Sequence, residues 1–335
     1  MSSKKTTDTK KKPFRILRTI LKIIGIILAV ILLAVAVLAV RHHILSKKDR
    51  ELVANAYGEY YTTSNGARMN YTFYDSTSED VAVIIPGYGS PTVHYEFDAF
   101  AKALKDKYKI VIAEPLGYGL SDGTDSPRTV EKYCEELHGL MEHLGYDRYT
   151  IIGHSIAGLY ALYYANEYTD EVEAFIGIDA SVPHQTDQDD WTAKPDNVCR
   201  IYKCMRPLYI TSGINRVMNE LSIDAIMAQI PTLTADDKDK VLAMYSTFQL
   251  TDTQMNEMEL LDRNMKKCYD LKFPESVPVL YVLAKDNCDT MAEWESYHKD
   301  LVTAPKSVVT IIDGQHYLHY TNLDGLIEKI EHWEY

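Results

Sequence analysis

The sequence of 335 residues is poor in glycine and proline, with 16 and 12 residues, and this shortage excludes collagen-like, linker-rich and low-complexity chains. Basic residues are also fewer than acidic ones: 35 Lys and Arg stand against 48 Asp and Glu, for a formal net charge of −13 at pH 7. A general nucleic-acid-binding protein needs a basic face to neutralise phosphates, so we expect no nucleic-acid partner. Hydrophobic residues are plentiful, at 46% of the chain, enough for one large folded domain or two modest ones.

The charge is divided unequally along the chain. Residues 1–50 hold 12 Lys and Arg but only two acidic residues, a net charge of +10. Subtraction from the whole-chain totals leaves 23 basic and 46 acidic residues after position 50, a net charge of −23. The first 50 residues and the rest of the chain therefore have opposite electrostatic character.

A run of eighteen residues without charge, 23–40, falls within the basic part. As a helix it is about 27 Å long, which matches the hydrocarbon core of a bilayer. It has no polar face, as a helix on the surface of a soluble core would have. We therefore predict a transmembrane helix over 19–41. The segment Ala34-Val35-Ala36 resembles a signal-peptidase site, so a cleaved secretory signal is the alternative.

Basic flanks of a transmembrane helix tend to remain in the cytoplasm, and eight Lys and Arg precede the run while four follow it. This distribution predicts a basic cytoplasmic tail over 1–18, a signal anchor over 19–41 and a juxtamembrane linker over 42–65. The large domain, 66–335, is then expected outside the cell, held at the cell membrane by one pass. The basic end is expected to contact anionic membrane lipid.

After residue 65, short apolar runs alternate with amphipathic segments, which predicts an α/β fold with a mostly parallel sheet covered by helices on both faces. The first two runs, separated by an acidic turn, look like an edge hairpin. Between 180 and 277 the chain is rich in helix formers, which predicts an inserted helical lid over about 184–275. The expected strands are 69–74, 81–85, 109–113, 149–152, 175–178, 279–283 and 307–312, and the expected helices are 96–107, 129–144, 156–168 and 323–333.

The strongest local motif is Gly153-His154-Ser155-Ile156-Ala157-Gly158, between a predicted strand and a predicted helix. A nucleophilic serine needs a sharp turn at the carboxyl end of a strand, with small neighbours that let the backbone bend. Gly153 and Ala157 are these neighbours, although the usual pattern has glycine where Ala157 stands. The helix that follows would also point its first amides at an oxyanion beside Ser155.

With this motif in place, residues 66–335 resemble the α/β-hydrolase fold family. Ile85-Pro86-Gly87-Tyr88-Gly89-Ser90 is similar to the family's oxyanion loop, with Pro86 where a histidine is usual. Gly117-Tyr118-Gly119-Leu120-Ser121-Asp122 matches a turn that is frequent after the family's second strand. By position, the resemblance implies an oxyanion hole formed by the amides of Tyr88 and Ile156. The segments HSIAGLYALYYANEY and IGIDASVP are further similar to a membrane-anchored subgroup common in Gram-positive bacteria.

Family order implies that the base and its carboxylate follow Ser155. His316 follows the last predicted strand and is the expected base, while His319 corresponds to a second, non-catalytic histidine. The expected acid is Asp286, at the end of the strand before His316. Its spacing is one residue shorter than the common pattern, so Asp179 and Asp289 stay as alternatives.

The resemblance implies a serine hydrolase that cleaves carboxylic esters of small acyl substrates through an acyl-enzyme, without metal or cofactor. A serine nucleophile disfavours dehalogenase and epoxide hydrolase chemistry, which use aspartate in this fold. Two alternatives stay open: an aminopeptidase-like or amide-cleaving enzyme, and a non-catalytic binding module tethered to the membrane. Acidic lid residues that could receive a substrate amine are Asp187, Asp189, Asp190, Asp236, Asp237 and Asp239.

The five cysteines give no clear metal motif, because no second ligand pair follows the Cys199 and Cys204 spacing. Outside the cell these two residues could form a disulfide.

Overall fold

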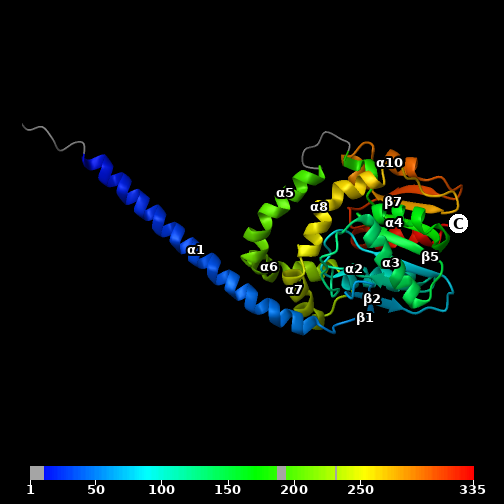
Figure 1. Cartoon of the computed structure of the whole chain (residues 1–335), viewed down its shortest axis with the longest axis horizontal. Coiled ribbons are helices and arrows are strands. Elements are labelled where there is room, and N and C mark those ends of the chain that lie inside the picture. Colours follow the sequence, from blue (N-terminus) through cyan, green and yellow to red (C-terminus); the bar gives the residue numbers. More distant parts are fainter. Residues whose placement is uncertain (1–10, 187–193, 231) are drawn as a thin grey trace, which may run out of the picture.

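The computed structural model describes residues 11–186, 194–230 and 232–335. Helix α1 (Lys11–Val53) extends away from a domain in which a central sheet is covered by helices (Figure 1). Among the described residues, α1 is the one helix long and apolar enough to cross a membrane, and its apolar window is not covered by the rest of the protein. A core helix of a soluble domain would be covered. Residues 1–10 of the predicted cytoplasmic tail lie outside the described residues.

The segment 42–65, predicted to be a linker, is ordered secondary structure instead. Helix α1 continues to Val53, and strand β1 (Glu59–Thr62) pairs with β2 (Arg68–Tyr74) at the edge of the sheet. The helix continues because its last turns pack on the lid helices rather than entering water. The domain therefore begins well before residue 66.

The sheet has eight strands in the order β1-β2-β4-β3-β5-β6-β7-β8. The pairs β1–β2 and β2–β4 are antiparallel, while β3 to β8 run parallel, which confirms the predicted fold class. The remaining strands are β3 (Val81–Ile85), β4 (Lys109–Ala113), β5 (Tyr149–His154), β6 (Val172–Ile178), β7 (Val279–Ala284) and β8 (Val308–Ile312).

The predicted edge hairpin of 69–74 and 81–85 is wrong, because β4 lies between these two strands. Every residue of β3 is buried, so this strand requires a neighbour on each side and a covered face above and below. Strand β2 has exposed and half-buried positions and lies nearer the edge of the sheet.

Two hydrophobic clusters cover the two faces of the sheet. Helices α2 (Val93–Leu104) and α12 (Leu323–Glu331) contribute to one cluster. The other contains residues of α3 (Val130–Leu144), α4 (Ala157–Glu167) and α10 (Trp294–Leu301). Short helices α9 (Lys285–Thr290) and α11 (Leu318–Thr321) follow the last two strands.

The described residues between β6 and β7 form the helices of the lid. They comprise α5 (Pro195–Arg206), a single π-helical turn η3 (Pro207–Thr211), α6 (Ile214–Gln229), α7 (Lys238–Thr247) and α8 (Asp252–Lys267). The lid residues Asp187, Asp189 and Asp190 lie outside the described part of the chain. Cys199 and Cys204 do not form the suggested disulfide: both are free, the first buried and the second exposed, because they stand five residues apart on α5.

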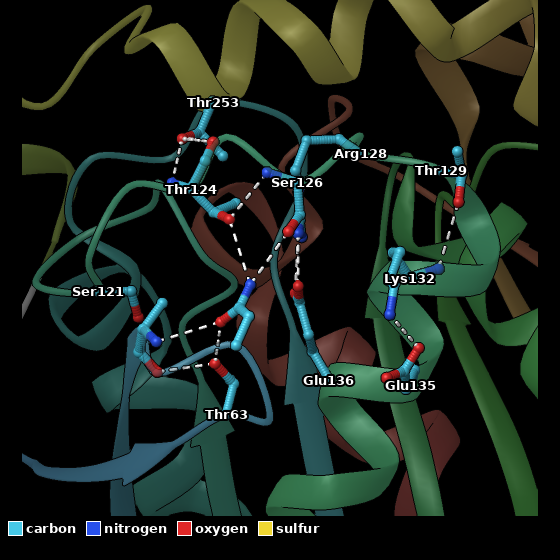
Figure 2. A network of polar contacts seen from close by, with 12 residues as sticks. Thr63, Ser121, Thr124, Ser126, Arg128, Thr129, Lys132, Glu135, Glu136 and Thr253 are labelled. Carbon is cyan, nitrogen blue, oxygen red and sulfur yellow. Dashed lines mark hydrogen bonds and ion pairs between the residues drawn. The ribbon is translucent and has the colours of Figure 1, made fainter.

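Buried polar contacts hold α8 against the sheet domain. The Glu257 carboxylate accepts hydrogen bonds from the hydroxyls of Tyr118 and Tyr160, and Thr253 exchanges hydrogen bonds with the backbone of Thr124. Figure 2 shows the contact between Thr253 and Thr124 beside the loop that precedes α3, where Arg128 donates to both oxygens of Glu136 at 2.8 Å. The last lid helix is therefore part of the rigid core.

Candidate active site

Ser155 occupies the sharp turn between β5 and α4, with φ of 53°, in the left-handed region that side chains rarely adopt. The turn requires close backbone packing on both sides. A Cβ on Gly153 would lie 3.1 Å from that of Ala157, and a Cβ on Gly158 would lie 2.5 Å from the carbonyl oxygen of Ser181. Alanine at 157 is therefore compatible with the turn, and the glycine is needed one position later.

The Ser155 hydroxyl meets His316, which the loop after β8 carries. The distance from His316 Nε2 to Ser155 Oγ is 3.0 Å. The histidine loop is held from behind by His154, whose Nε2 donates to the carbonyl oxygen of His316 at 3.1 Å. Burial lowers the pKa of His154 well below its ordinary value, so this imidazole is neutral and its Nε2 carries the proton.

The carboxylate that contacts His316 belongs to Asp179, directly after β6. Its Oδ2 lies 2.7 Å from His316 Nδ1, and its side chain is completely buried. Its Oδ1 accepts the backbone N–H of Ala284 and the indole N–H of Trp294, both at 3.0 Å, while Asn287 Nδ2 donates to Oδ2. Four donors thus surround one buried carboxylate.

The prediction that Asp286 orients the histidine is contradicted by this geometry. Asp286 is exposed in the first turn of α9, and it is the next residue, Asn287, that turns toward the site, with Nδ2 3.4 Å from His316 Nδ1. Asp289 is also exposed and pairs with Lys285. The sequence contained the signal in the one-residue offset after β7 and in the position of Asp179 at the end of a buried strand.

The loop after β3 lies against Ser155. A Cβ on Gly87 would lie 3.2 Å from that of Ser155 and 2.7 Å from His154 Nδ1, so only glycine fits. Within the described part of the chain, the backbone N–H groups of Tyr88 and Ile156 donate to no other group. Both amides belong to segments beside the serine, and two free donors at this place can stabilise an oxyanion.

A cavity of about 600 Å³ lies between this loop, the histidine loop and the lid. Its neutral polar lining includes Tyr88, Tyr245, Gln249, Tyr317 and Tyr320. One carboxylate, Glu96, lines its wall.

Glu96 is part of a buried cluster with two histidines. Its Oε1 lies 3.3 Å from His319 Nε2 and 4.0 Å from His154 Nδ1, and its Oε2 accepts a hydrogen bond from Ser90. These are the ligand types of a small cation site, and one ligand atom from each lies within 4.8 Å of the others. Through His154 the cluster also supports the His316 loop.

Comparisons with known proteins agree with this fold. The model of the alpha/beta hydrolase fold matches residues 81–198. The uncharacterized protein YbdG of Bacillus subtilis is 26% identical over 265 residues, which cover 78% of this chain and 79% of that protein. Epoxide hydrolase 1 of Caenorhabditis elegans is 31% identical over 140 residues, 40% of this chain and 33% of that protein. The solved structure of Cfl2 from Burkholderia cenocepacia has a TM-score of 0.63 at 17% identity, covering 82% of this chain and 94% of Cfl2.

The relative from Bacillus subtilis fits the predicted resemblance to proteins of Gram-positive bacteria. The parallel sheet, the strand-turn-helix around Ser155 and these matches lead to one conclusion: the chain has the α/β-hydrolase fold.

Proposed function

We propose that this protein is a membrane-anchored serine hydrolase that cleaves carboxylic esters through an acyl-enzyme. The observation that carries the proposal is the continuous hydrogen-bonded chain from Ser155 Oγ through His316 to the buried Asp179, with distances of 3.0 and 2.7 Å. Such a chain activates a weak hydroxyl nucleophile by giving its proton an acceptor and giving that acceptor a fixed orientation.

In this mechanism Ser155 Oγ attacks the ester carbonyl while His316 Nε2 takes its proton. The Asp179 carboxylate holds the proton on Nδ1 and stabilises the imidazolium that forms. The amides of Tyr88 and Ile156 donate to the developing oxyanion, and His316 then protonates the leaving alcohol. Water, activated by the same histidine, releases the acyl group and restores the serine.

The lining of the cavity favours a neutral substrate. The tyrosine and glutamine groups offer hydrogen bonds without charge, and the single carboxylate of the lining, Glu96, is buried and engaged with Ser90. An aminoacyl substrate would need a carboxylate free to receive its ammonium group. In the lid, Asp237 instead caps the turn at Thr234 and pairs with Lys240.

Epoxide hydrolase chemistry, which the name of one relative suggests, is disfavoured by the nucleophile. The position at the turn after β5 holds a serine. Attack of its oxygen on an epoxide carbon would form an ether that water does not hydrolyse, whereas an aspartate would form a hydrolysable ester.

The proposal includes α1 as the membrane anchor, with the domain on the outer side. An uncovered apolar helix and the excess of Lys and Arg before it support this orientation.

The test is labelling of the full chain, in detergent or lipid nanodiscs, with a fluorophosphonate probe. We expect labelling of the wild-type protein and of Ser296→Ala, an exposed control serine, but none of Ser155→Ala. A panel of acyl esters and aminoacyl amides then defines the bond cleaved. Absence of Ser155-dependent labelling would overturn the enzyme proposal, and preference for amides with a free amine would replace the ester by the peptidase alternative.

A further inference from the structure

The lid carries an apolar face that points away from the protein. On α5 and η3, Ile201, Met205 and Leu208 are 42%, 48% and 71% exposed. Their spacing of four and three residues places them on one side of the helix. We call this row, together with the corresponding row on α6, the outer lid face.

Helix α6 repeats the same spacing. Ile214, Met218 and Leu221 are 37%, 50% and 79% exposed, and the row continues through the exposed Ala225 and Ala228. An amphipathic helix of a soluble domain turns its apolar row inward and its polar row to water. Here two consecutive helices do the reverse.

Helix α3 provides the comparison within the same molecule. Its buried positions are apolar apart from Glu136, which pairs with Arg128, and its exposed ones include Lys132, Glu135 and Glu142. The outer lid face is thus a local property of α5, η3 and α6, and large contiguous apolar surfaces of this kind mark a binding surface.

The position of the membrane helix indicates what covers this face. Figure 1 shows α5 and α6 on the side of the domain that faces α1. Arg41 of α1 pairs with Glu220 of α6 at 2.7 Å, and Asp49 pairs with the buried Arg216. These contacts fix the lid to the end of the helix that leaves the bilayer.

One contact relates the position of the lid to the apolar run of α1. A Cβ on Gly213, in the turn between η3 and α6, would lie 2.9 Å from the carbonyl oxygen of Leu38. Leu38 is two residues before the end of the uncharged run at Val40, about 3 Å inside it at 1.5 Å per residue. Leu208 and Ile214, on either side of that turn, therefore lie at the edge of the hydrocarbon.

A second cavity lies at this edge and shares one lining residue with the cavity beside the oxyanion loop. This second cavity, of about 580 Å³, is lined by Ala39 and Val40 of α1 and by Ile210 and Thr211 of the lid. Gln249 lines both this cavity and the one beside the oxyanion loop, and Ala228, the last residue of the α6 row, lines the latter.

We propose that the outer lid face rests in the surface of the bilayer that α1 spans, and that the substrate is an amphiphilic ester which reaches Ser155 from the lipid phase. The substrate part of this inference rests on the proposed hydrolase function, whereas the docking part rests only on α1 spanning the membrane. Exposed basic residues on the same elements are Arg200 on α5, Lys203 on α5, which also pairs with Glu259, and Lys47 on α1; side chains of this charge attract anionic headgroups.

Docking is tested by tryptophan fluorescence in proteoliposomes made with ordinary or brominated phosphatidylcholine, since bromine quenches only tryptophans in contact with the acyl chains. Leu208→Trp and Leu221→Trp place the reporter on the outer lid face, and Leu33→Trp places it in α1. Val308→Trp and Ile311→Trp are the controls, on exposed apolar positions of β8, at the opposite edge of the sheet. Each signal is compared with that of the native tryptophans.

We expect at least twofold quenching at 33, 208 and 221, and none beyond the native background at 308 and 311. Quenching at 33 with none at 208 and 221 would overturn lid docking and leave the anchor standing. Absence of quenching at 33 would overturn the anchor, and the docking with it.

The substrate class is tested with Leu208→Gln combined with Leu221→Gln. We expect kcat/KM for a long-chain ester dissolved in vesicles to fall about tenfold, while that for a short water-soluble ester is unchanged and Ser155 is still labelled. Val308→Gln is the matched control. Equal effects on both esters would overturn the lipid route without touching the hydrolase proposal, whereas failure to hydrolyse any ester would count against the hydrolase proposal itself.

Discussion

Replacing Asp179 by asparagine tests which residue orients the histidine. The carboxylate accepts from four donors, and an asparagine at 179 offers one oxygen and one amide group in place of two oxygens. The backbone N–H of Ala284 and the indole N–H of the buried Trp294 cannot turn away, so the new oxygen must face them. The amide group then faces Asn287 and His316.

The consequence is a change of tautomer. Facing an N–H donor, His316 must present the lone pair of Nδ1, which leaves the proton on Nε2, 3.0 Å from Ser155 Oγ. That imidazole cannot accept the serine proton. We expect kcat to fall about 10⁴-fold, equivalent to about 5.5 kcal/mol of transition-state stabilisation.

The assay is hydrolysis of a chromogenic ester by the full chain, with circular dichroism and thermal melting to show that the variants fold. Asp286→Asn is the control, because its exposed side chain lies outside the network, and we expect less than a threefold change. A double variant, Asp179→Asn with Asn287→Asp, places a carboxylate where Nδ2 now lies, 3.4 Å from His316 Nδ1. It should recover at least tenfold over the single variant. Equal losses in Asp286→Asn and Asp179→Asn would refute the assignment.

Three further predictions concern stability. Burial raises the pKa of Glu114 to about 7 from its usual 4.5, so the protonated form of this carboxyl group favours the folded state. Between pH 4.5 and pH 7, the free energy of unfolding should therefore fall by about 3 kcal/mol more in the wild-type protein than in Glu114→Gln. Urea titration at each pH measures this, and parallel profiles of the two proteins would contradict it. Glu136→Gln leaves the fully buried Arg128 guanidinium without its partner and should lower the free energy of unfolding by about 3–5 kcal/mol. The control Glu173→Gln, in the exposed pair with Arg148, should lower it by less than about 1 kcal/mol. Similar decreases in the two variants would contradict the role given to burial. Gly158→Ala forces a methyl group to 2.5 Å from the Ser181 carbonyl oxygen. The substitution should lower the free energy of unfolding by about 1–3 kcal/mol and slow probe labelling of Ser155. An unchanged melting temperature would show that α4 moves freely.

Much of the fold was predictable because its strands are short apolar runs with turn residues between them. The seven expected strands all correspond to strands of the sheet, and the serine turn lies where the motif indicated. The pairing of the strands was harder to predict from the sequence. The run 69–74 is adjacent in sequence to 81–85, yet the fully buried β3 takes β4 and β5 as neighbours, a choice that depends on the cover of both faces.

The site shows the same division between local and tertiary information. Ser155 and His316 follow strands whose ends meet at one edge of a parallel sheet, so their proximity follows from the topology. The acid depends on which strand end faces the imidazole and on a single residue of offset after β7. There the helical turn of α9 exposes Asp286 and presents Asn287. The spacing after β7 pointed to position 287, but it could not show that Asp179, at the end of β6, supplies the carboxylate.

The boundary of the folding unit was also misplaced, and the reason bears on function. A polar, basic stretch after an apolar helix is predicted to be a linker because the residues that it contacts in the fold are remote in sequence. Asp49 meets the buried Arg216 and accepts from Thr247, 167 and 198 residues away. A buried guanidinium without its carboxylate is strongly destabilising, so the last turns of α1 belong to the lid. At its other end the lid is held to the core by Glu257. The segment that covers the active site is thus braced between α1 and the sheet, so under the proposed anchoring by α1 the fold itself sets the orientation of the cavity relative to the bilayer.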